Sequence, residues 1–243
     1  MAAQYGQLAG KFLETNELAV RLVEGYSLRK ALGSMEGQDA LDLGCGAGLY
    51  TRYLKQWGAA RCMGVDISQE MVQNARRSEQ EVPLGIEYHV ADVAEMPDLG
   101  TFDVALAVYV LHYAHSREHL LRMCRRIHAH LSPGGRFVTY VANPDFSAQL
   151  PNNTRYGVTV LDFPASPQEG QGISVVLHTQ PPITIHYFYW SGATYEWALR
   201  EAGFRDITWS KPSCPPEGLG GQGPAFWRDY THNPQSVVLR AER

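Results

Sequence analysis

Three glycines at alternate positions, directly after a short apolar segment, constrain this chain more than any other feature. Residues 40–43 read Ala-Leu-Asp-Leu, and Gly44, Gly46 and Gly48 follow. Glycine tolerates a positive φ angle and lets a ligand approach bare backbone, so a strand that ends this way is typical of a binding turn. The next apolar segment ends in Asp66, where a carboxylate can accept both hydroxyls of a ribose. Together these features predict a site for a nucleoside-bearing cofactor.

Short apolar segments alternate with amphipathic segments over the first 141 residues. We expect strands at residues 39–43, 61–66, 86–90, 102–108 and 135–141, and helices at residues 4–32, 48–57, 68–80 and 116–131. Nearly continuous apolar strands that alternate with helices are typical of a parallel sheet covered on both faces. This part of the chain is therefore predicted to be an α/β domain.

The pattern changes after residue 141. Residues 142–172 are rich in Pro, Gly, Asn and Ser and show no period, so no element is predicted there. Beyond them we expect a hairpin of strands at 173–177 and 183–190, a helix at 194–202, and strands at 204–210 and 236–241. We interpret the chain as one domain with a cap inserted between its fifth and sixth strands.

The composition limits the partners of the protein. The 243 residues are 44% hydrophobic and 19% charged, with a net charge of −4, which argues against a nucleic-acid partner. Arg122, Arg125 and Arg126 cluster, but their spacing fits the solvated face of a helix. There is no apolar run of membrane-spanning length, and the N-terminus lacks the layout of a secretory signal. Four scattered cysteines are typical of reduced thiols, so we expect a cytoplasmic location.

The glycine spacing separates two kinds of nucleoside cofactor. A dinucleotide turn needs a glycine or alanine at position 49, where this chain has Leu49, and an NAD-linked dehydrogenase is therefore disfavoured. Asp42, two residues before the first glycine, suits a cationic ligand better than a pyrophosphate. At this point the sequence resembles the class I S-adenosylmethionine-dependent methyltransferases, whose first motif is an acid followed by Gly-x-Gly-x-Gly.

Four further segments resemble the motifs of that family in order: residues 65–68 (Val-Asp-Ile-Ser), 89–93 (His-Val-Ala-Asp-Val), 102–108 and 131–137. The resemblance is close over residues 40–141 and holds in outline over 191–243. It implies a Rossmann-like seven-stranded α/β sheet of order 3-2-1-4-5-7-6, with helices on both faces and residues 236–241 as the antiparallel last strand. It further implies a single domain over residues 1–243, with residues 1–35 as a helical lid and 142–190 as an inserted substrate cap.

The resemblance also implies S-adenosylmethionine as the cofactor. Asp66 would bind the ribose diol, Asp92 the adenine amino group, and Ile67 and Val93 the two faces of the purine. Near the N-terminus, Tyr5 and the residues after it resemble a Tyr-Asp-x-x-Ala-x-x-Tyr motif of small-molecule methyltransferases, with core packing as the alternative. The full set of expected cofactor-binding residues is Tyr5, Phe12, Arg21, Asp42, Gly44, Cys45, Gly46, Gly48, Asp66, Ile67, Met71, Ala91, Asp92, Val93, Ala107 and Val108. For Arg21, a solvated surface arginine is the alternative.

The acceptor site is less clearly marked. Methyl transfer from a sulfonium mainly requires that donor and acceptor be held in line, and a general base is needed only when the acceptor loses a proton early. Candidate bases are Tyr109, His112 and His186, and candidate acceptor-binding residues are Tyr109, Tyr113, Tyr187 and Tyr189. Strand alternation places Tyr187 and Tyr189 on one face and His186 on the other. No catalytic residue is identified beyond these candidates.

The cap is rich in aromatic residues, which favours a small, flat, aromatic or heteroaromatic acceptor. Residues 189–196 and 216–227 resemble toxoflavin-type N-methyltransferases, so N- or O-methylation in secondary metabolism is expected. An RNA methyltransferase and a non-catalytic protein that binds S-adenosylmethionine on the same fold remain alternatives. Asn143 and Asp145 do not have the spacing of a catechol-type metal site, so no metal is expected. A monomer or a homodimer is equally compatible with the sequence.

Overall fold

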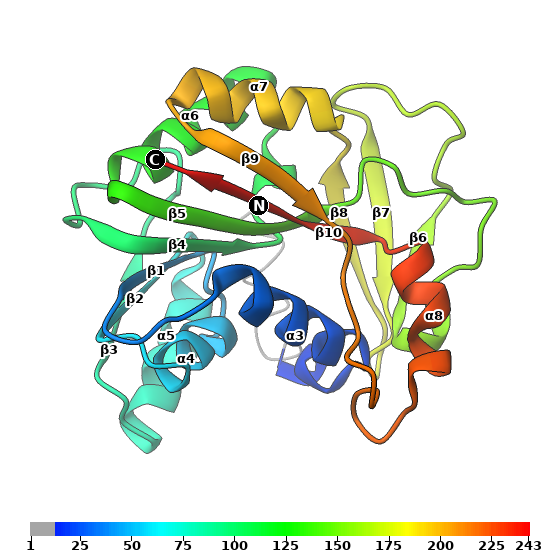
Figure 1. The fold of residues 1–243 in the computed structure, drawn as a ribbon, viewed down its shortest axis with the longest axis horizontal. Coiled ribbons are helices and arrows are strands. Elements are labelled where there is room, and N and C mark those ends of the chain that lie inside the picture. Colours follow the sequence, from blue (N-terminus) through cyan, green and yellow to red (C-terminus); the bar gives the residue numbers. More distant parts are fainter. Residues whose placement is uncertain (1–12) are drawn as a thin grey trace.

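The computed structural model describes residues 13–243. Its main sheet has seven strands in the order β3-β2-β1-β4-β5-β10-β9 (Figure 1). The strands are β1 (Asp39–Leu43), β2 (Arg61–Asp66), β3 (Ile86–Val90), β4 (Phe102–Val108), β5 (Leu131–Ala142), β9 (Arg205–Ser210) and β10 (Ser236–Glu242). The first five run parallel, and β10 is antiparallel to both of its neighbours. The predicted strand order and antiparallel last strand are therefore confirmed.

Helices cover both faces of this sheet, as Figure 1 shows. The α-helices are α3 (Val20–Leu32), α4 (Leu49–Gln56), α5 (Gln69–Glu81), α6 (Arg117–Ala129), α7 (Gly192–Ala202) and α8 (Pro224–His232), and the short 3-10 helices are η1 (Leu13–Glu17), η2 (Leu111–Tyr113) and η3 (Thr154–Tyr156). Several α-helices have a serine at the N-cap, because its hydroxyl oxygen accepts an otherwise unpaired N–H of the first turn. Ser68 accepts from Met71 N–H at 3.3 Å, and Ser116 accepts from His119 N–H at 3.1 Å.

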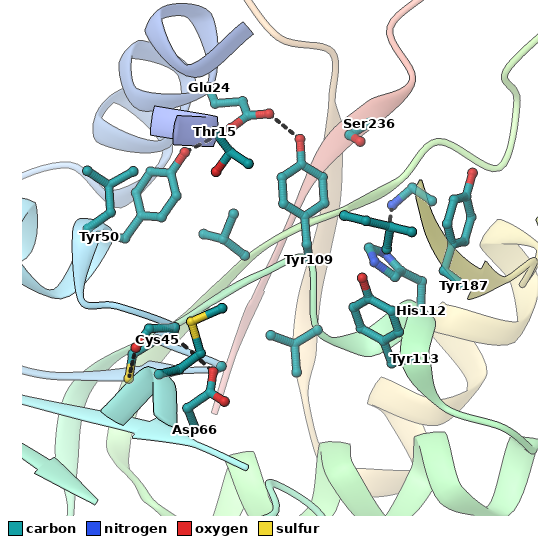
Figure 2. Close-up of a pocket in the computed structure, with 18 of the residues that line it drawn as sticks. Thr15, Glu24, Cys45, Tyr50, Asp66, Tyr109, His112, Tyr113, Tyr187 and Ser236 are labelled. Carbon is teal, nitrogen blue, oxygen red and sulfur yellow. Dashed lines mark hydrogen bonds between the residues drawn. The ribbon is translucent and has the colours of Figure 1, made fainter. Parts of the chain in front are cut away.

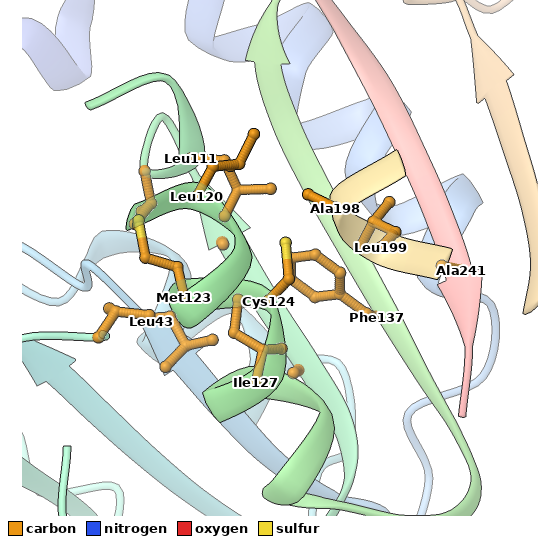
Figure 3. Packing of buried hydrophobic residues seen from close by; sticks show 14 of the residues in the cluster. Leu43, Leu111, Leu120, Met123, Cys124, Ile127, Phe137, Ala198, Leu199 and Ala241 are labelled. Atoms are coloured by element: carbon orange, nitrogen blue, oxygen red, sulfur yellow. The ribbon is translucent and has the colours of Figure 1, made fainter. Parts of the chain in front are cut away.

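Two apolar layers hold the helices on the sheet. On one face α6 and α7 pack through Leu120, Ile127 and Leu199 against the buried side chains of Leu43 and Phe137 (Figure 3). On the other face, α3, α4 and α5 form a second cluster with the opposite side of the same strands. Residues 104–107 of β4 are completely buried because the strand is covered on both sides. The sheet is therefore a rigid platform whose edge can carry a site.

A second, three-stranded antiparallel sheet lies between β5 and α7 in sequence. It consists of β6 (Val158–Leu161), β7 (Gly172–Leu177) and β8 (Ile183–Phe188), paired in that order. The hairpin of β7 and β8 was predicted, whereas β6 was not. β6 has only four residues and gains its strand geometry by pairing with β7, from Val158 opposite Leu177 to Leu161 opposite Ser174. This non-local pairing leaves no periodicity in the sequence.

Two other elements differ from the expectation. β5 begins at Leu131, because Leu131 pairs with Phe102 and the ladder resumes at Arg136 opposite Val104. The intervening residues 132–135, Ser-Pro-Gly-Gly, form a bulge in the strand. No element was predicted between residues 210 and 236, and the structure has helix α8 there, which begins at Pro224 and buries Trp227 and Tyr230. In the part of the chain that the structure describes, no helix has the length and apolar character needed to cross a membrane.

Candidate functional site

One cavity opens at the carboxyl ends of β1, β2 and β4. The glycine turn after β1 and the acid at the end of β2 line one end. Helix α3, η2 and the second sheet line the other end, through residues that include Tyr113, Ile185 and Tyr187. Figure 2 shows Cys45 and Asp66 on one side of Tyr109, with His112 and Tyr187 on the other. Ligands of open parallel sheets bind at this edge, where the strand order reverses.

The three glycines of the turn have different structural reasons. All have positive φ angles: 66° at Gly44, 53° at Gly46 and 91° at Gly48. A Cβ atom on Gly44 would lie 2.4 Å from a methyl of Val110, and one on Gly48 would lie 2.5 Å from the hydroxyl of Tyr88. A Cβ on Gly46 would meet no atom within 4 Å. Gly46 is therefore the position where a ligand can approach the backbone most closely.

Asp66 closes the turn from the neighbouring strand. One carboxylate oxygen accepts the N–H of Gly46 at 2.9 Å, and the other accepts the N–H of Ser68 at 2.8 Å. Burial raises the pKa of this carboxyl, although the two N–H groups oppose the shift. Each oxygen keeps a further lone pair, so the carboxylate can also accept a pair of ribose hydroxyls. These acceptor oxygens fit the hydroxyls of the nucleoside predicted from the sequence.

Asp42 is a buried acid beneath the same turn. The hydroxyl of Thr51 donates to its carboxylate at 2.6 Å. Burial nevertheless raises the pKa of Asp42 from 3.8 to about 7. A cation bound in the cavity that Asp42 lines would favour its ionised form. The acid is thus placed for a positively charged ligand, as its position in the motif suggested.

The residues expected to bind the adenine also line the cavity. Ile67, Met71, Asp92 and Val93 line it, as do His119 and Met123 of α6, which were not expected. Among the remaining cofactor candidates, Arg21, Gly44, Cys45 and Val108 line the same cavity. The structure thus gathers side chains from β1, β2, β4 and the loop after β3 around one space.

Three expected residues do not line the cavity. Gly48 lies under Tyr88 and begins α4. Ala91 packs against the core, with its N–H donated to the carbonyl oxygen of Asp66 at 3.0 Å. Ala107 is completely buried in the apolar layer beneath α6 and α7, because strand alternation turns it from the cavity. Tyr5 and Phe12 lie outside the described residues.

The structure reveals a buried acid that the sequence reasoning missed. Glu24 of α3 is completely buried and forms an ion pair with Arg21 at 2.7 Å. It also accepts the hydroxyl of Tyr50 at 2.9 Å and the hydroxyl of Tyr109. Arg21 is therefore held in the cavity wall rather than at a solvated surface. The available signal was an acid four residues after Val20, on the apolar face of the helix.

The acceptor end of the cavity is aromatic. Tyr109 follows β4 with a φ angle of 60°, a strained conformation for a residue other than glycine. The His112 ring lies 4.7 Å from that of Tyr113 and 4.9 Å from that of Tyr187, between ring centroids. The backbone N–H of Ala142 donates to His112 Nδ1 at 3.2 Å. Burial lowers the pKa of His112 to about 3.

Two expected acceptor-site residues lie elsewhere. His186 is exposed on the outer face of β8, where it hydrogen-bonds to Ser174 at 2.9 Å. The expected alternation is correct, since Ile185 and Tyr187 face the cavity. Tyr189 lies beyond the end of β8, so alternation no longer governs it, and its hydroxyl donates to the carbonyl of Pro144 at 3.4 Å. Neither His186 nor Tyr189 is among the residues that line this cavity.

Asn143 occupies a turn after β5. Its amide nitrogen donates to the carbonyl of Pro234 at 2.8 Å, and its oxygen accepts the N–H of Asp145 at 2.9 Å. Over residues 13–243 no three His, Cys, Asp or Glu side chains are grouped so that they could hold a metal ion.

Comparison with known proteins places this geometry in context. A family model described as a methyltransferase domain matches residues 41–139. The chain is 28% identical over 216 residues to the N-demethylindolmycin N-methyltransferase of Streptomyces griseus, which covers 86% of this chain and 84% of that protein. It is 27% identical over 118 residues to the ubiquinone biosynthesis O-methyltransferase of Coxiella burnetii, and it spans about half the length of that relative (49%).

The fold is also similar to solved structures. A crystal structure of an S-adenosylmethionine-dependent methyltransferase from Mesorhizobium loti superposes with a TM-score of 0.63. The match covers 93% of this chain and all of the other, at 22% sequence identity. At that identity the similarity concerns the fold alone. The residues matched by the family model, 41–139, contain the glycine turn and the acids at positions 42, 66 and 92.

Proposed function

This chain is a class I S-adenosylmethionine-dependent methyltransferase, and we propose that it methylates a small, flat, aromatic or heteroaromatic molecule on nitrogen or oxygen. The observation that carries the proposal is the continuity of one cavity. Its one end holds the glycine turn with Asp42 and Asp66, and its other end holds the rings of Tyr113 and Tyr187. Aromatic walls bind flat ligands by stacking.

The residues of the first end fit the cofactor. Asp66, Ile67, Asp92 and Val93 all line this end of the cavity. Asp66 would bind the ribose, Asp92 the adenine, and Ile67 and Val93 the faces of the purine. Burial raises the pKa of Asp42 to about 7, and a bound cationic group would favour its ionised form. When bound, S-adenosylmethionine supplies a methyl group on a positively charged sulfur, which is already activated toward a nucleophile. The protein's task is then to align the acceptor and to exclude water.

The second end supports acceptors that need no strong base, and this favours nitrogen. The hydroxyl of Tyr109 is donated to Glu24, and the Nδ1 atom of His112 is engaged by Ala142. A neutral amine or ring nitrogen offers a lone pair without losing a proton first, and the proton it later releases can pass to water. The named activity of the Streptomyces griseus relative, N-methylation of N-demethylindolmycin, supports N-methylation of a small molecule.

RNA is the second candidate acceptor, and two observations disfavour it. The net charge is −4, and the second sheet lies over the acceptor end with the apolar side chains of Val158, Val175 and Leu177. Nucleic-acid sites need a basic face along the backbone.

The test is transfer of a labelled methyl group to three acceptor pools: N-heteroaromatic compounds, phenols, and total RNA. We expect product from the first pool, with loss of activity in Asp66→Ala and retention in His186→Ala. Labelled RNA alone would overturn the small-molecule proposal. Binding of S-adenosylhomocysteine without turnover of any pool would instead favour a non-catalytic binding protein.

A further inference from the structure

We propose that His112 is a positioning residue whose Nε2–H donates a hydrogen bond to a second, non-reacting atom of the molecule that is methylated. The inference rests on the proposed function and adds a chemical requirement to it. The acceptor must carry a carbonyl oxygen or an unprotonated ring nitrogen near the atom that receives the methyl group.

The tautomer of His112 follows from one backbone contact. The N–H of Ala142, at the end of β5, donates to His112 Nδ1 at 3.2 Å. A backbone N–H can only donate, so Nδ1 must present its lone pair. A neutral imidazole with a lone pair on Nδ1 carries its proton on Nε2. The sheet, and not a ligand, therefore determines which ring nitrogen is the donor.

The surroundings of the ring keep it neutral. A second proton on Nδ1 would point at the N–H of Ala142, and burial already lowers the pKa of His112 to about 3. The groups packed around it are the rings of Tyr109, Tyr113 and Tyr187, with centroids 4.7–5.9 Å away. None of the ion pairs formed within residues 13–243 involves His112. A neutral ring protonated at Nε2 cannot take a proton there, so His112 is not a general base.

His112 lines the cavity at the acceptor end, beside Tyr113 and Tyr187 (Figure 2). No group within residues 13–243 hydrogen-bonds to Nε2 in the structure. Nε2 is not among the enclosed polar atoms that lack a partner in the described chain, so it is accessible from the cavity. A ligand that covers it without accepting its hydrogen would leave a buried donor unpaired, which is costly. A carbonyl oxygen or ring nitrogen of a bound flat molecule would pair it and fix the orientation of that molecule.

The first experiment is ¹⁵N NMR of the histidine-labelled full chain bound to S-adenosylhomocysteine. The His112 signals are assigned by their loss in His112→Phe. We expect a neutral ring with the proton on Nε2 throughout pH 5.5 to 8.5. A proton on Nδ1, or titration within this range, would overturn the inference. Calorimetry first establishes that S-adenosylhomocysteine binds; failure at that step would count against the proposed function instead.

The second experiment measures the affinity of two probes, indazole and indole, for the same complex. Both are flat bicycles with one N–H, but only indazole has a ring nitrogen that accepts a hydrogen bond. We expect about tenfold tighter binding of indazole, the effect of about one hydrogen bond. The preference should fall below about twofold in His112→Phe, persist in His186→Phe, and partly return in His112→Gln, whose amide can donate. Equal affinities in the wild type, or binding of neither probe, would refute the proposal.

Discussion

Glu24 in the first long helix accepts a hydrogen bond from the hydroxyl of Tyr109, the strained residue that follows β4. This contact joins residues 85 positions apart in the sequence. Because Glu24 also binds Arg21 and Tyr50, it ties α3 and α4 to the carboxyl end of the main sheet. A buried carboxylate, and not apolar packing alone, thus holds α3 and α4 against the edge of the sheet at the cavity.

We expect Glu24→Gln to lower the free energy of unfolding by about 3 kcal/mol, because it leaves the Arg21 charge without its partner in a buried site. Urea denaturation measures the change. The control is Glu242→Gln, which removes the half-exposed ion pair with Arg240 and should cost less than about 1 kcal/mol. An equal loss of unfolding free energy in the two variants would show that the Glu24–Arg21 ion pair stabilises the protein no more than a surface pair does.

Asp42 should make the stability of the ligand-free protein depend on pH. Its pKa in the folded state, about 7, is above the ordinary value of 3.8. Between these values the unfolded chain has released the proton and the folded chain still holds it, so the contribution of Asp42 to stability falls as the pH rises. The unfolding free energy of the wild type minus that of Asp42→Asn should fall over this window and level off above it.

A matched variant locates the source of this effect. Thr51→Val removes the hydroxyl that favours the ionised form of Asp42, so the falling limb should extend to higher pH. A pH-independent difference between the wild type and Asp42→Asn would contradict the assignment. Thermal denaturation at a series of pH values provides the measurement.

Asp66→Ala should weaken the binding of S-adenosylhomocysteine about 100-fold, because the carboxylate is placed to accept two ribose hydroxyls and charged hydrogen bonds are the stronger ones. Titration calorimetry measures the affinity. Asp103→Asn is the control, since Asp103 accepts the N–H of Asp39 at the opposite end of the sheet. Unchanged affinity in Asp66→Ala would place the nucleoside elsewhere.

Two alanine substitutions in the glycine turn should have different effects. Gly44→Ala drives a methyl group to 2.4 Å from the Val110 side chain, so it should lower stability by about 2 kcal/mol or more. Gly46→Ala meets no protein atom and pays mainly the cost of a positive φ angle, about 1 kcal/mol. Its methyl should instead obstruct the cofactor, with at least a tenfold loss of S-adenosylhomocysteine affinity by calorimetry. A Gly46 variant that binds normally would argue against close backbone approach.

Local sequence pattern predicted the main sheet well. The apolar segment at 102–108 is β4 with the same bounds, and the glycines at 44–48 form the turn at its neighbour's end. It failed where an element depends on a distant partner. β6 exists through its pairing with β7, and the breaker residues near 133 became a bulge because both flanks of β5 pair with β4.

The sequence by itself predicted the strands of the main sheet, the glycine turn and the acids beside it, because these rest on periodicity and on motifs of a few adjacent residues. The resemblance that those motifs carry implied the strand order. Only the tertiary structure decided which side chains meet at the acceptor end. Helix α3 places Glu24 in the cavity wall, and His186 lies on the outer face of β8. The tautomer of His112 depends on the backbone N–H of Ala142 in β5. Such contacts join segments far apart in the chain, and packing leaves no trace of them in local pattern.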